Sequence, residues 1–277
     1  MRYLLLLLIL TSCSSAQVVF CNPELCNTYI ADNIASSEKA DCAFYSISSE
    51  KVEQALENHK GKIRIVMHNR KNGLMHNKFC ILDEIVITGS YNPRDKAGRH
   101  DHILIIKDDQ AKQNFQSEFN ELWTGVFGKG LKTEEQGQIK TYFCPEDDCA
   151  LHVIEEISKA KEQICFLEFS FTSGEIAVAL IERYQNGIKI KGVMDNSQIR
   201  QYSMFSLLNN QGIIVRKGNL HDKLFIIDNT VISGSFNPTK NAQLRNDENI
   251  VIIKNKLLSE QLREECNRIF KQSFTEE

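Results

Sequence analysis

The chain lacks an excess of either charge, a long hydrophobic run and a zinc-type cysteine motif. Its 277 residues carry 33 Lys and Arg against 36 Asp and Glu, a formal net charge of −3. No overall positive field therefore draws it to nucleic acid or to an anionic membrane. The apolar run over residues 4–10 is too short to span a bilayer. No Cys-x-x-Cys pair with nearby histidines predicts zinc, and no carboxylate-rich cluster predicts another metal. The sequence predicts neither a metal nor a cofactor.

The N-terminus has the build of an export signal. One Arg precedes the apolar run and small polar residues follow it, as in a signal peptide. Residues 10–13, Leu-Thr-Ser-Cys, resemble the bacterial lipobox, in which cleavage precedes a cysteine that becomes lipidated. Residues 1–12 would then be a signal peptide, and Cys13 would anchor the mature protein to a membrane, on the periplasmic or cell-surface side. The alternatives are a secretory signal cut after Ala16, which would release the protein, and a short buried N-terminal strand.

Eight cysteines remain besides Cys13, an even number that suits disulfides in an oxidising compartment. Two pairs share the same spacing, and we expect a small loop disulfide in each: Cys21–Cys26 and Cys144–Cys149. Three other cysteines lie in apolar runs and are expected to be small buried residues: Cys42, Cys80 and Cys165. Cys266 stands in a helical stretch and predicts nothing.

The chain is an internal duplication. HNKFCILDEIVITGSYN begins at His76, and HDKLFIIDNTVISGSFN begins at His221. The similarity continues outside these motifs, since VVFCNPELCNTYI parallels TYFCPEDDCALHV and RHDHILIIK parallels NDENIVIIK. A repeat of this length indicates two complete structural units. We expect a first half at 18–132, a linker at 133–138 and a second half at 139–277. The first half is shorter before its motif, which predicts the loss of a strand and a helix.

Strand-like and helix-like runs alternate in both halves. QICFLEFSF and KLFIIDN are rich in apolar and β-branched residues, whereas ALHVIEEISKAK and GEIAVALIERYQNG have apolar residues at helical spacing. This alternation predicts an α/β fold. A polar break at Asp83 and Glu84 predicts a tight hairpin, which makes each sheet mixed rather than purely parallel. The expected architecture is two pseudo-symmetric halves, each a mixed sheet flanked by helices, with the active site at their interface.

The repeated motif carries groups that suit a phosphodiester. His76 and Lys78 stand two positions apart, so on a strand they point to the same face. Two copies related by a pseudo-twofold axis would place two histidines and two lysines around one pocket. The lysines would neutralise the non-bridging oxygens. One neutral imidazole would attack phosphorus and a protonated one would protonate the leaving oxygen. The pattern therefore favours metal-free displacement through a phosphohistidine.

The duplicated pattern His-x-Lys-x4-Asp-x6-Gly-Ser-x-Asn resembles the phospholipase D superfamily, and its compact build resembles the endonuclease and cardiolipin-hydrolase-like branch. The resemblance covers nearly all of the mature chain and implies the fold of that superfamily. It implies that His76 is the nucleophile and His221 the general acid. It further implies that phosphate is bound by Lys78, Lys223, Asn92 and Asn237, with the help of Ser90 and Ser235. It implies that Glu248 and the matching Asp101 support the opposite histidines. Asp83 and Asp228 would be structural members of the motif at the strand ends.

Residues outside the motif carry weaker signals. His100 and His102 are expected at the surface or at the rim of the site. Four aromatic residues are candidates for base stacking, although core packing explains most of them equally well: Tyr91, Tyr202, Phe205 and Phe236.

Three functions are compatible with these residues. The first is a phospholipid hydrolase or phosphatidyl transferase, which an exported and membrane-anchored location favours. The second is an exported endonuclease that cleaves DNA or RNA. The third is a surface lipoprotein that only binds phosphate. The expected partners are a phosphodiester substrate and a membrane, and the protein is expected to be a monomer because one chain carries both motifs.

Overall fold

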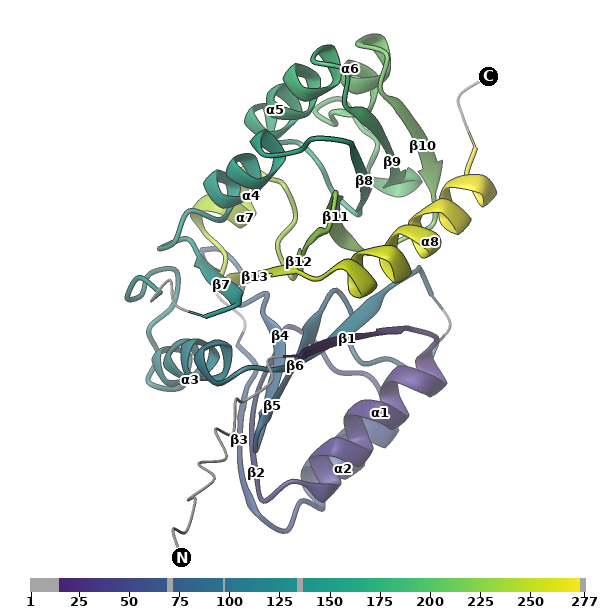
Figure 1. Cartoon of the computed structure of the whole chain (residues 1–277). Helices are drawn as coiled ribbons and strands as arrows, with labels where there is room; N and C mark the ends of the chain where they lie inside the picture. The colour runs from purple at the N-terminus through teal and green to yellow at the C-terminus, as the bar shows by residue number, and fades with distance from the viewer. Residues whose placement is uncertain (1–14, 69–71, 97, 134–136, 275–277) are drawn as a thin grey trace, which may run out of the picture.

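The chain folds into two halves, each built on one mixed β-sheet (Figure 1). The computed structural model describes residues 15–68, 72–96, 98–133 and 137–274, so the predicted signal peptide and Cys13 lie outside the described residues. The strands of the first sheet, in spatial order, are β1 (Ser15–Phe20), β6 (His102–Lys107), β5 (Ile85–Gly89), β4 (Lys78–Leu82), β2 (Lys39–Phe44) and β3 (Lys62–Val66). Those of the second are β7 (Ile139–Cys144), β13 (Glu248–Lys254), β12 (Thr230–Gly234), β11 (Lys223–Ile227), β8 (Gln163–Glu168), β9 (Lys189–Asp195) and β10 (Ile214–Gly218).

The two sheets follow one plan. In each, a central hairpin pairs antiparallel with its neighbours. The parallel pairs are β2 with β3 in the first sheet, and β8 with β9 and β9 with β10 in the second. The predicted mixed sheets are therefore confirmed. The second sheet has one more strand, and among the described residues the first half has no counterpart of β10 or of the helix α6 (Phe205–Asn210) before it. This difference matches the shorter spacing before the first motif.

Helices cover the outer face of each sheet, and α3 and α8 lie at the border between the halves (Figure 1). The first half contributes α1 (Pro23–Ser36), α2 (Glu50–Glu57) and α3 (Asp109–Trp123), and the second contributes α4 (Cys149–Ser158), α5 (Gly174–Gln185), α6, α7 (Lys240–Leu244) and α8 (Lys256–Gln272). Helices α3 and α8 pack against both sheets, and their apolar side chains belong to one core shared by the halves. Within the described residues, no helix is both long and apolar enough to cross a membrane.

The Asp that both repeats share has a structural role at the hairpin. Asp83 and Asp228 adopt φ values of 49° and 48°, a left-handed conformation that short polar side chains tolerate. The Asp83 carboxylate accepts hydrogen bonds from the backbone N–H groups of Glu38 and Lys39. The Asp228 carboxylate does the same for three N–H groups of residues 161–163. Each Asp thus fastens the hairpin to the start of the neighbouring strand, at the end of its own strand opposite the Lys.

The Gly-Ser step of the motif also has a steric reason. Gly89 and Gly234 have φ values of 140° and 154°. A Cβ atom would lie 2.5 Å from the His102 carbonyl oxygen in the first case and 2.2 Å from that of Asn249 in the second. Only glycine fits this close approach of two strands. The backbone N–H of the following Ser donates to the same carbonyl oxygen, His102 for Ser90 and Asn249 for Ser235, so each Ser is held against the neighbouring strand.

Four disulfides staple the fold. The predicted pairs Cys21–Cys26 and Cys144–Cys149 are both present. Cys42, Cys80 and Cys165 are buried as expected, but they are not free cysteines. They form two further disulfides, because strand register or helix packing brings the partners together: Cys42–Cys80 across β2 and β4, and Cys165–Cys266 between β8 and α8.

Candidate active site

The two motif histidines lie where the halves meet. Each stands directly before a central strand, and its backbone is held by the other half. The His76 N–H donates to the Asp247 carbonyl oxygen at 2.9 Å, and the His221 N–H donates to the His100 carbonyl oxygen at 2.7 Å. These crossed backbone bonds fix both imidazoles at one interface, as the duplicated pattern predicts.

Each imidazole is paired with a carboxylate of the opposite half. His76 Nδ1 lies 2.7 Å from Glu248 Oε2, and His221 Nδ1 lies 2.9 Å from Asp101 Oδ1. Both carboxylates are fully buried. A carboxylate on Nδ1 fixes the ring orientation and directs Nε2 away from it, toward a substrate. The shorter side chain of Asp101 therefore reaches its histidine as Glu248 does.

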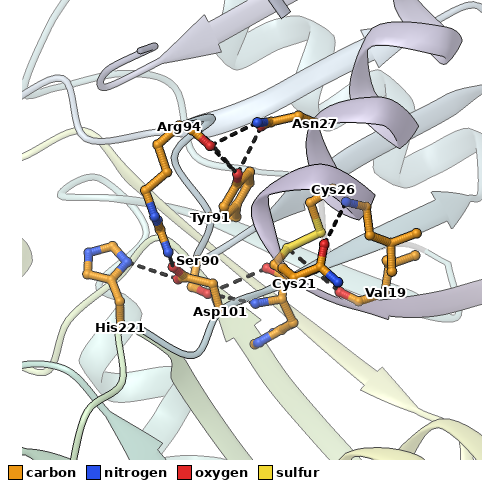
Figure 2. Close-up of a disulfide and its surroundings, with 12 residues drawn as sticks. Val19, Cys21, Cys26, Asn27, Ser90, Tyr91, Arg94, Asp101 and His221 are labelled. Atoms are coloured by element: carbon orange, nitrogen blue, oxygen red, sulfur yellow. Dashed lines mark hydrogen bonds and ion pairs between the residues drawn. A yellow bond between two sulfur atoms is a disulfide. The ribbon is translucent and has the colours of Figure 1, made fainter. Parts of the chain in front are cut away.

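The second oxygen of each carboxylate is held differently. Glu248 Oε1 accepts from the neutral amide of Asn246 at 2.9 Å, and Ser235 Oγ donates to Oε2 at 2.7 Å. Asp101 Oδ2 instead accepts from the Arg94 guanidinium at 2.7 Å. Figure 2 shows Arg94 and His221 both reaching Asp101. The His221 side of the site thus carries an additional cation.

The motif lysines are buried beneath the histidines. Lys78 Nζ donates to the His76 carbonyl oxygen and Lys223 Nζ to the His221 carbonyl oxygen, both at 2.6 Å. Burial lowers the pKa of Lys78 well below its usual range and also lowers the pKa of Lys223, against the opposing effects of the nearby carboxylates. The Lys223 charge also lowers the pKa of Lys78. An anion bound near both amines would compensate their charge.

The histidine pKa values are depressed for related reasons. Burial lowers the pKa of His76, opposed by Glu248. Burial, followed by the charge of Lys223, lowers the pKa of His221 to about 3. The Lys78 charge also acts on His221 and the Lys223 charge on His76. The four groups therefore form one electrostatic unit, in which burial favours the neutral imidazoles.

The motif asparagines are the remaining phosphate-binding candidates. The Oδ1 atoms of Asn92 and Asn237 are buried and have no hydrogen-bond partner among the described residues. Both follow the Gly-Ser step of their motif, and Asn92 lines the same cavity as His221. Ser90 differs from Ser235, since its hydroxyl bonds to the backbone of His102 rather than to the acidic residue.

His102 is not at the surface or rim, so that expectation is wrong. It is 1% exposed, and its Nδ1 and Nε2 lie 2.7 Å from Asp222 Oδ1 and Ser233 Oγ of the other half. The matching position of the second half holds Asn249, whose amide donates to Asn77 Oδ1 at 2.7 Å. A second layer of polar contacts therefore ties the halves together directly behind the two dyads. A lone histidine in a strand gives no sequence signal for such a partner.

The aromatic residues beside the histidines differ from those proposed for stacking. Tyr91, Phe205 and Phe236 are buried in the core, and Tyr202 is exposed. The rings that contact the site are Tyr45, 4.8 Å from the His76 ring, and Phe169, 4.7 Å from the His221 ring. They occupy matching places in the repeat, directly after β2 and β8, and this correspondence is the signal that sequence reasoning missed.

One group of carboxylates lies apart from the histidines. Oxygen atoms of Glu118, Glu121 and Glu146 lie within 4.8 Å of one another. Burial raises the pKa of Glu118 well above its usual range and that of Glu146 to about 7. Glu118 accepts a hydrogen bond from Asn77, next to His76, at 2.9 Å. Burial thus favours the neutral forms of Glu118 and Glu146, and the contact of Glu118 with Asn77 is structural.

Comparison with known proteins agrees with this arrangement. A family profile described as "Cardiolipin synthase, PLD-like domain" matches residues 15–123 and 153–270. A phospholipase D of Rickettsia prowazekii is 32% identical over 131 residues, which cover 45% of this chain and 64% of that protein. A mitochondrial cardiolipin hydrolase of Chlamydomonas reinhardtii is 24% identical over 123 residues, which cover 42% of this chain and 55% of that protein. The matches therefore span less than two thirds of these relatives.

A solved structure shares the fold of both halves. The crystal structure of phosphatidylserine synthase from Haemophilus influenzae matches with a TM-score of 0.71 and 11% identity, covering 93% of this chain and 87% of that one. At this identity the likeness concerns the fold alone.

Proposed function

The chain belongs to the phospholipase D superfamily, as a PLD-like domain of the cardiolipin synthase type, and from this membership we propose that it is a phosphodiesterase that acts on phospholipids. The observation that carries the proposal is the pair of crossed dyads, His76 with Glu248 and His221 with Asp101, above two buried lysines. Such a site offers a nucleophile, an acid and cationic donors for one phosphodiester.

The first step forms a bond between His76 Nε2 and phosphorus and breaks the bond from phosphorus to the leaving oxygen. Glu248 accepts a hydrogen bond from the Nδ1–H group of His76, which leaves the Nε2 lone pair free to attack. The bound phosphodiester brings a negative charge, which raises the pKa of His221 and allows this residue to carry a proton. His221 gives that proton to the leaving alkoxide, and a phosphohistidine remains.

The second step reverses these roles. Neutral His221 takes a proton from water, the water oxygen bonds to phosphorus, and the P–N bond to His76 breaks. An alcohol in place of water gives transphosphatidylation by the same route. Throughout, Lys78, Lys223 and the amides of Asn92 and Asn237 hold the non-bridging oxygens, where charge grows in the transition state.

The location of the first strand supports an anchored form of the protein. Cleavage before Cys13 leaves β1 whole. A cut after Ala16 would remove Ser15 and Ala16, which pair with Lys107 and Ile106 at the edge of the first sheet. We therefore favour an exported lipoprotein whose site faces phospholipid beside the membrane.

One observation favours a nuclease as the second candidate. The Tyr45 ring is 42% exposed beside His76, and an exposed ring at a phosphodiester site is a stacking platform for a nucleobase. A lipid glycerol would use the same ring only as an apolar wall.

A paired assay in EDTA tests the proposal. A form of the protein that begins at residue 14 is given phospholipid vesicles in one tube and labelled single-stranded DNA and RNA in another. His76→Asn is the inactive variant, and His68→Asn, at an exposed histidine outside the site, is its matched control. Headgroup release that His76→Asn alone abolishes supports the lipid enzyme. Strand cleavage that His76→Asn alone abolishes supports the nuclease. Absence of activity on both the vesicles and the nucleic acids supports a protein that only binds phosphate.

A further inference from the structure

A polar cavity of about 460 Å³ opens beside His221. It is lined by two serines, two asparagines, Gly98, Arg94, Arg99 and His221. Across the described part of the chain, neither a carboxylate nor an aromatic ring belongs to this lining. The cavity adjoins the dyad that protonates the leaving group in the proposed mechanism, so the alcohol that departs from phosphorus lies here.

Arg94 is fixed as one wall of the cavity. Its guanidinium donates to Asp101 Oδ2 at 2.7 Å. Its backbone oxygen accepts from Asn27 Nδ2 at 2.8 Å and from the Tyr91 hydroxyl at 3.1 Å, as Figure 2 shows. The cation is therefore held in place before any ligand binds, which lowers the entropic cost of binding.

Arg99 is the more accessible cation of the two. Its side chain is 40% exposed, and Nε lies 3.1 Å from Asp195 Oδ2. One terminal nitrogen donates to Ser197 Oγ at 3.2 Å. A guanidinium has five N–H donors, so several remain for an anion. Asp195 is 1% exposed and also accepts from the Leu220 backbone, so it orients Arg99 without lining the cavity.

The cavity breaks the pseudo-twofold symmetry of the site. Arg94 follows the Asn-Pro step of the first motif, and the matching residue of the second half is the neutral Thr239. At the His76 dyad, the group that donates to the second oxygen of Glu248 is likewise neutral, the amide of Asn246. The two ester arms of a bound phosphodiester therefore meet different charges.

We propose that this cavity is the leaving-group subsite and that it takes a phospholipid headgroup bearing a second phosphate. The inference rests on the proposed function, which it deepens. A phosphate receives paired N–H donors from a guanidinium. A choline or ethanolamine headgroup would need carboxylates or aromatic faces and would meet two arginines instead. A nucleotide fits less well, because the nearby Phe169 ring is already covered by the Arg99 guanidinium, 5.1 Å from its centroid, and is not free for a base to stack on.

The test compares two lipids that differ by one phosphate on the same leaving group. Phosphatidylinositol, phosphatidylinositol 4-phosphate and phosphatidylcholine are presented at equal mole fraction in neutral detergent micelles. The variants are Arg99→Gln and, as matched control, Lys96→Gln, an exposed cation of the same loop outside the cavity. A soluble diester, bis(p-nitrophenyl) phosphate, reports the chemistry without the headgroup, and His76→Asn reports its background.

The expected result is a kcat/KM about tenfold or more higher for the phosphorylated lipid than for phosphatidylinositol, since a charged hydrogen bond contributes on that scale. Phosphatidylcholine should be the slowest. Arg99→Gln should abolish the preference for the phosphorylated lipid, and Lys96→Gln should retain it. His76-dependent cleavage of the soluble diester by each variant reports that the variant is folded and active.

Three outcomes would overturn the inference while the diester is still cleaved in a His76-dependent way. The first is equal rates for the two inositol lipids, and the second is a preference that survives Arg99→Gln. The third is faster cleavage of a single-stranded oligonucleotide, assayed under the same conditions, than of either lipid. Absence of His76-dependent cleavage of the soluble diester would instead remove the proposed function itself.

Discussion

His76 of the first half and Glu248 of the second share a hydrogen bond of 2.7 Å, and His221 and Asp101 form the reciprocal pair at 2.9 Å. Each half supplies one histidine and the carboxylate that orients the other histidine. A catalytic unit therefore exists only when both halves are folded against each other. The shared apolar core and the polar layer around His102 and Asn249 maintain that contact.

The first prediction concerns the carboxylate of the His76 dyad. Glu248→Gln keeps the shape of the side chain but removes the charge that selects the His76 tautomer, so kcat on the soluble diester should fall about 10³-fold, on the scale of comparable dyads. KM should change little, because Glu248 does not contact the substrate directly. Steady-state kinetics measure both constants. Glu57→Gln, at an exposed glutamate of α2, is the control, and a loss below tenfold in Glu248→Gln would contradict the orienting role.

The second prediction follows from the pKa of His221, which burial and Lys223 lower to about 3. The unfolded chain titrates near about 6.5, so below that pH the unfolded state binds more protons than the folded state. The free energy of unfolding should therefore fall with decreasing pH, by up to about 1.4 kcal/mol per pH unit from this residue.

His221→Asn removes this contribution. The free energy of unfolding of the wild type minus that of His221→Asn should decrease as the pH is lowered from 6.5 to 5. Urea unfolding curves measured at several pH values give this difference. His68→Asn controls for the loss of a histidine elsewhere. A difference between wild type and His221→Asn that stays constant with pH would show that His221 is not held neutral in the fold.

The third prediction concerns the disulfides. Cys165 and Cys266 are 101 positions apart, whereas Cys21 and Cys26 are five apart. In the chain-entropy account, closing the longer loop stabilises by about 5 kcal/mol and the shorter by about 2 kcal/mol. The Cys165→Ala/Cys266→Ala double variant should thus lose more unfolding free energy than Cys21→Ala/Cys26→Ala. Unreduced peptide mapping should yield all four linked pairs, and free thiols at Cys165 and Cys266 would refute the assignment.

The fourth prediction concerns metal ions. The lysines and the asparagine amides supply the charge and hydrogen bonds that a metal would otherwise supply to the phosphate. Activity on the soluble diester should therefore survive dialysis against EDTA. Loss of activity that added Mg²⁺, Ca²⁺ or Zn²⁺ restores would show that a metal takes part.

Much of this architecture follows from the duplication. The repeat predicts the two histidines, the two lysines and the hairpin at Asp83, because strand periodicity and turn chemistry are local properties. The small loop disulfides are also local, since each joins cysteines five positions apart.

Contacts that depend on register or on packing between the halves could not be obtained in this way. The Cys42–Cys80 disulfide requires that these residues be direct partners across β2 and β4. The partners of His102 lie 120 and 131 positions away, and no local pattern specifies them.

The measurement that tests the central claim most directly is the capture of the covalent intermediate. The protein is mixed with a phosphodiester labelled on the phosphoryl side, quenched in alkali to preserve phosphohistidine, digested and mapped by mass spectrometry. The account predicts one modified peptide, containing His76, that disappears in His76→Asn and whose formation matches a burst of leaving alcohol. Cleavage with neither burst nor modified histidine would contradict it and would mean that water attacks phosphorus directly.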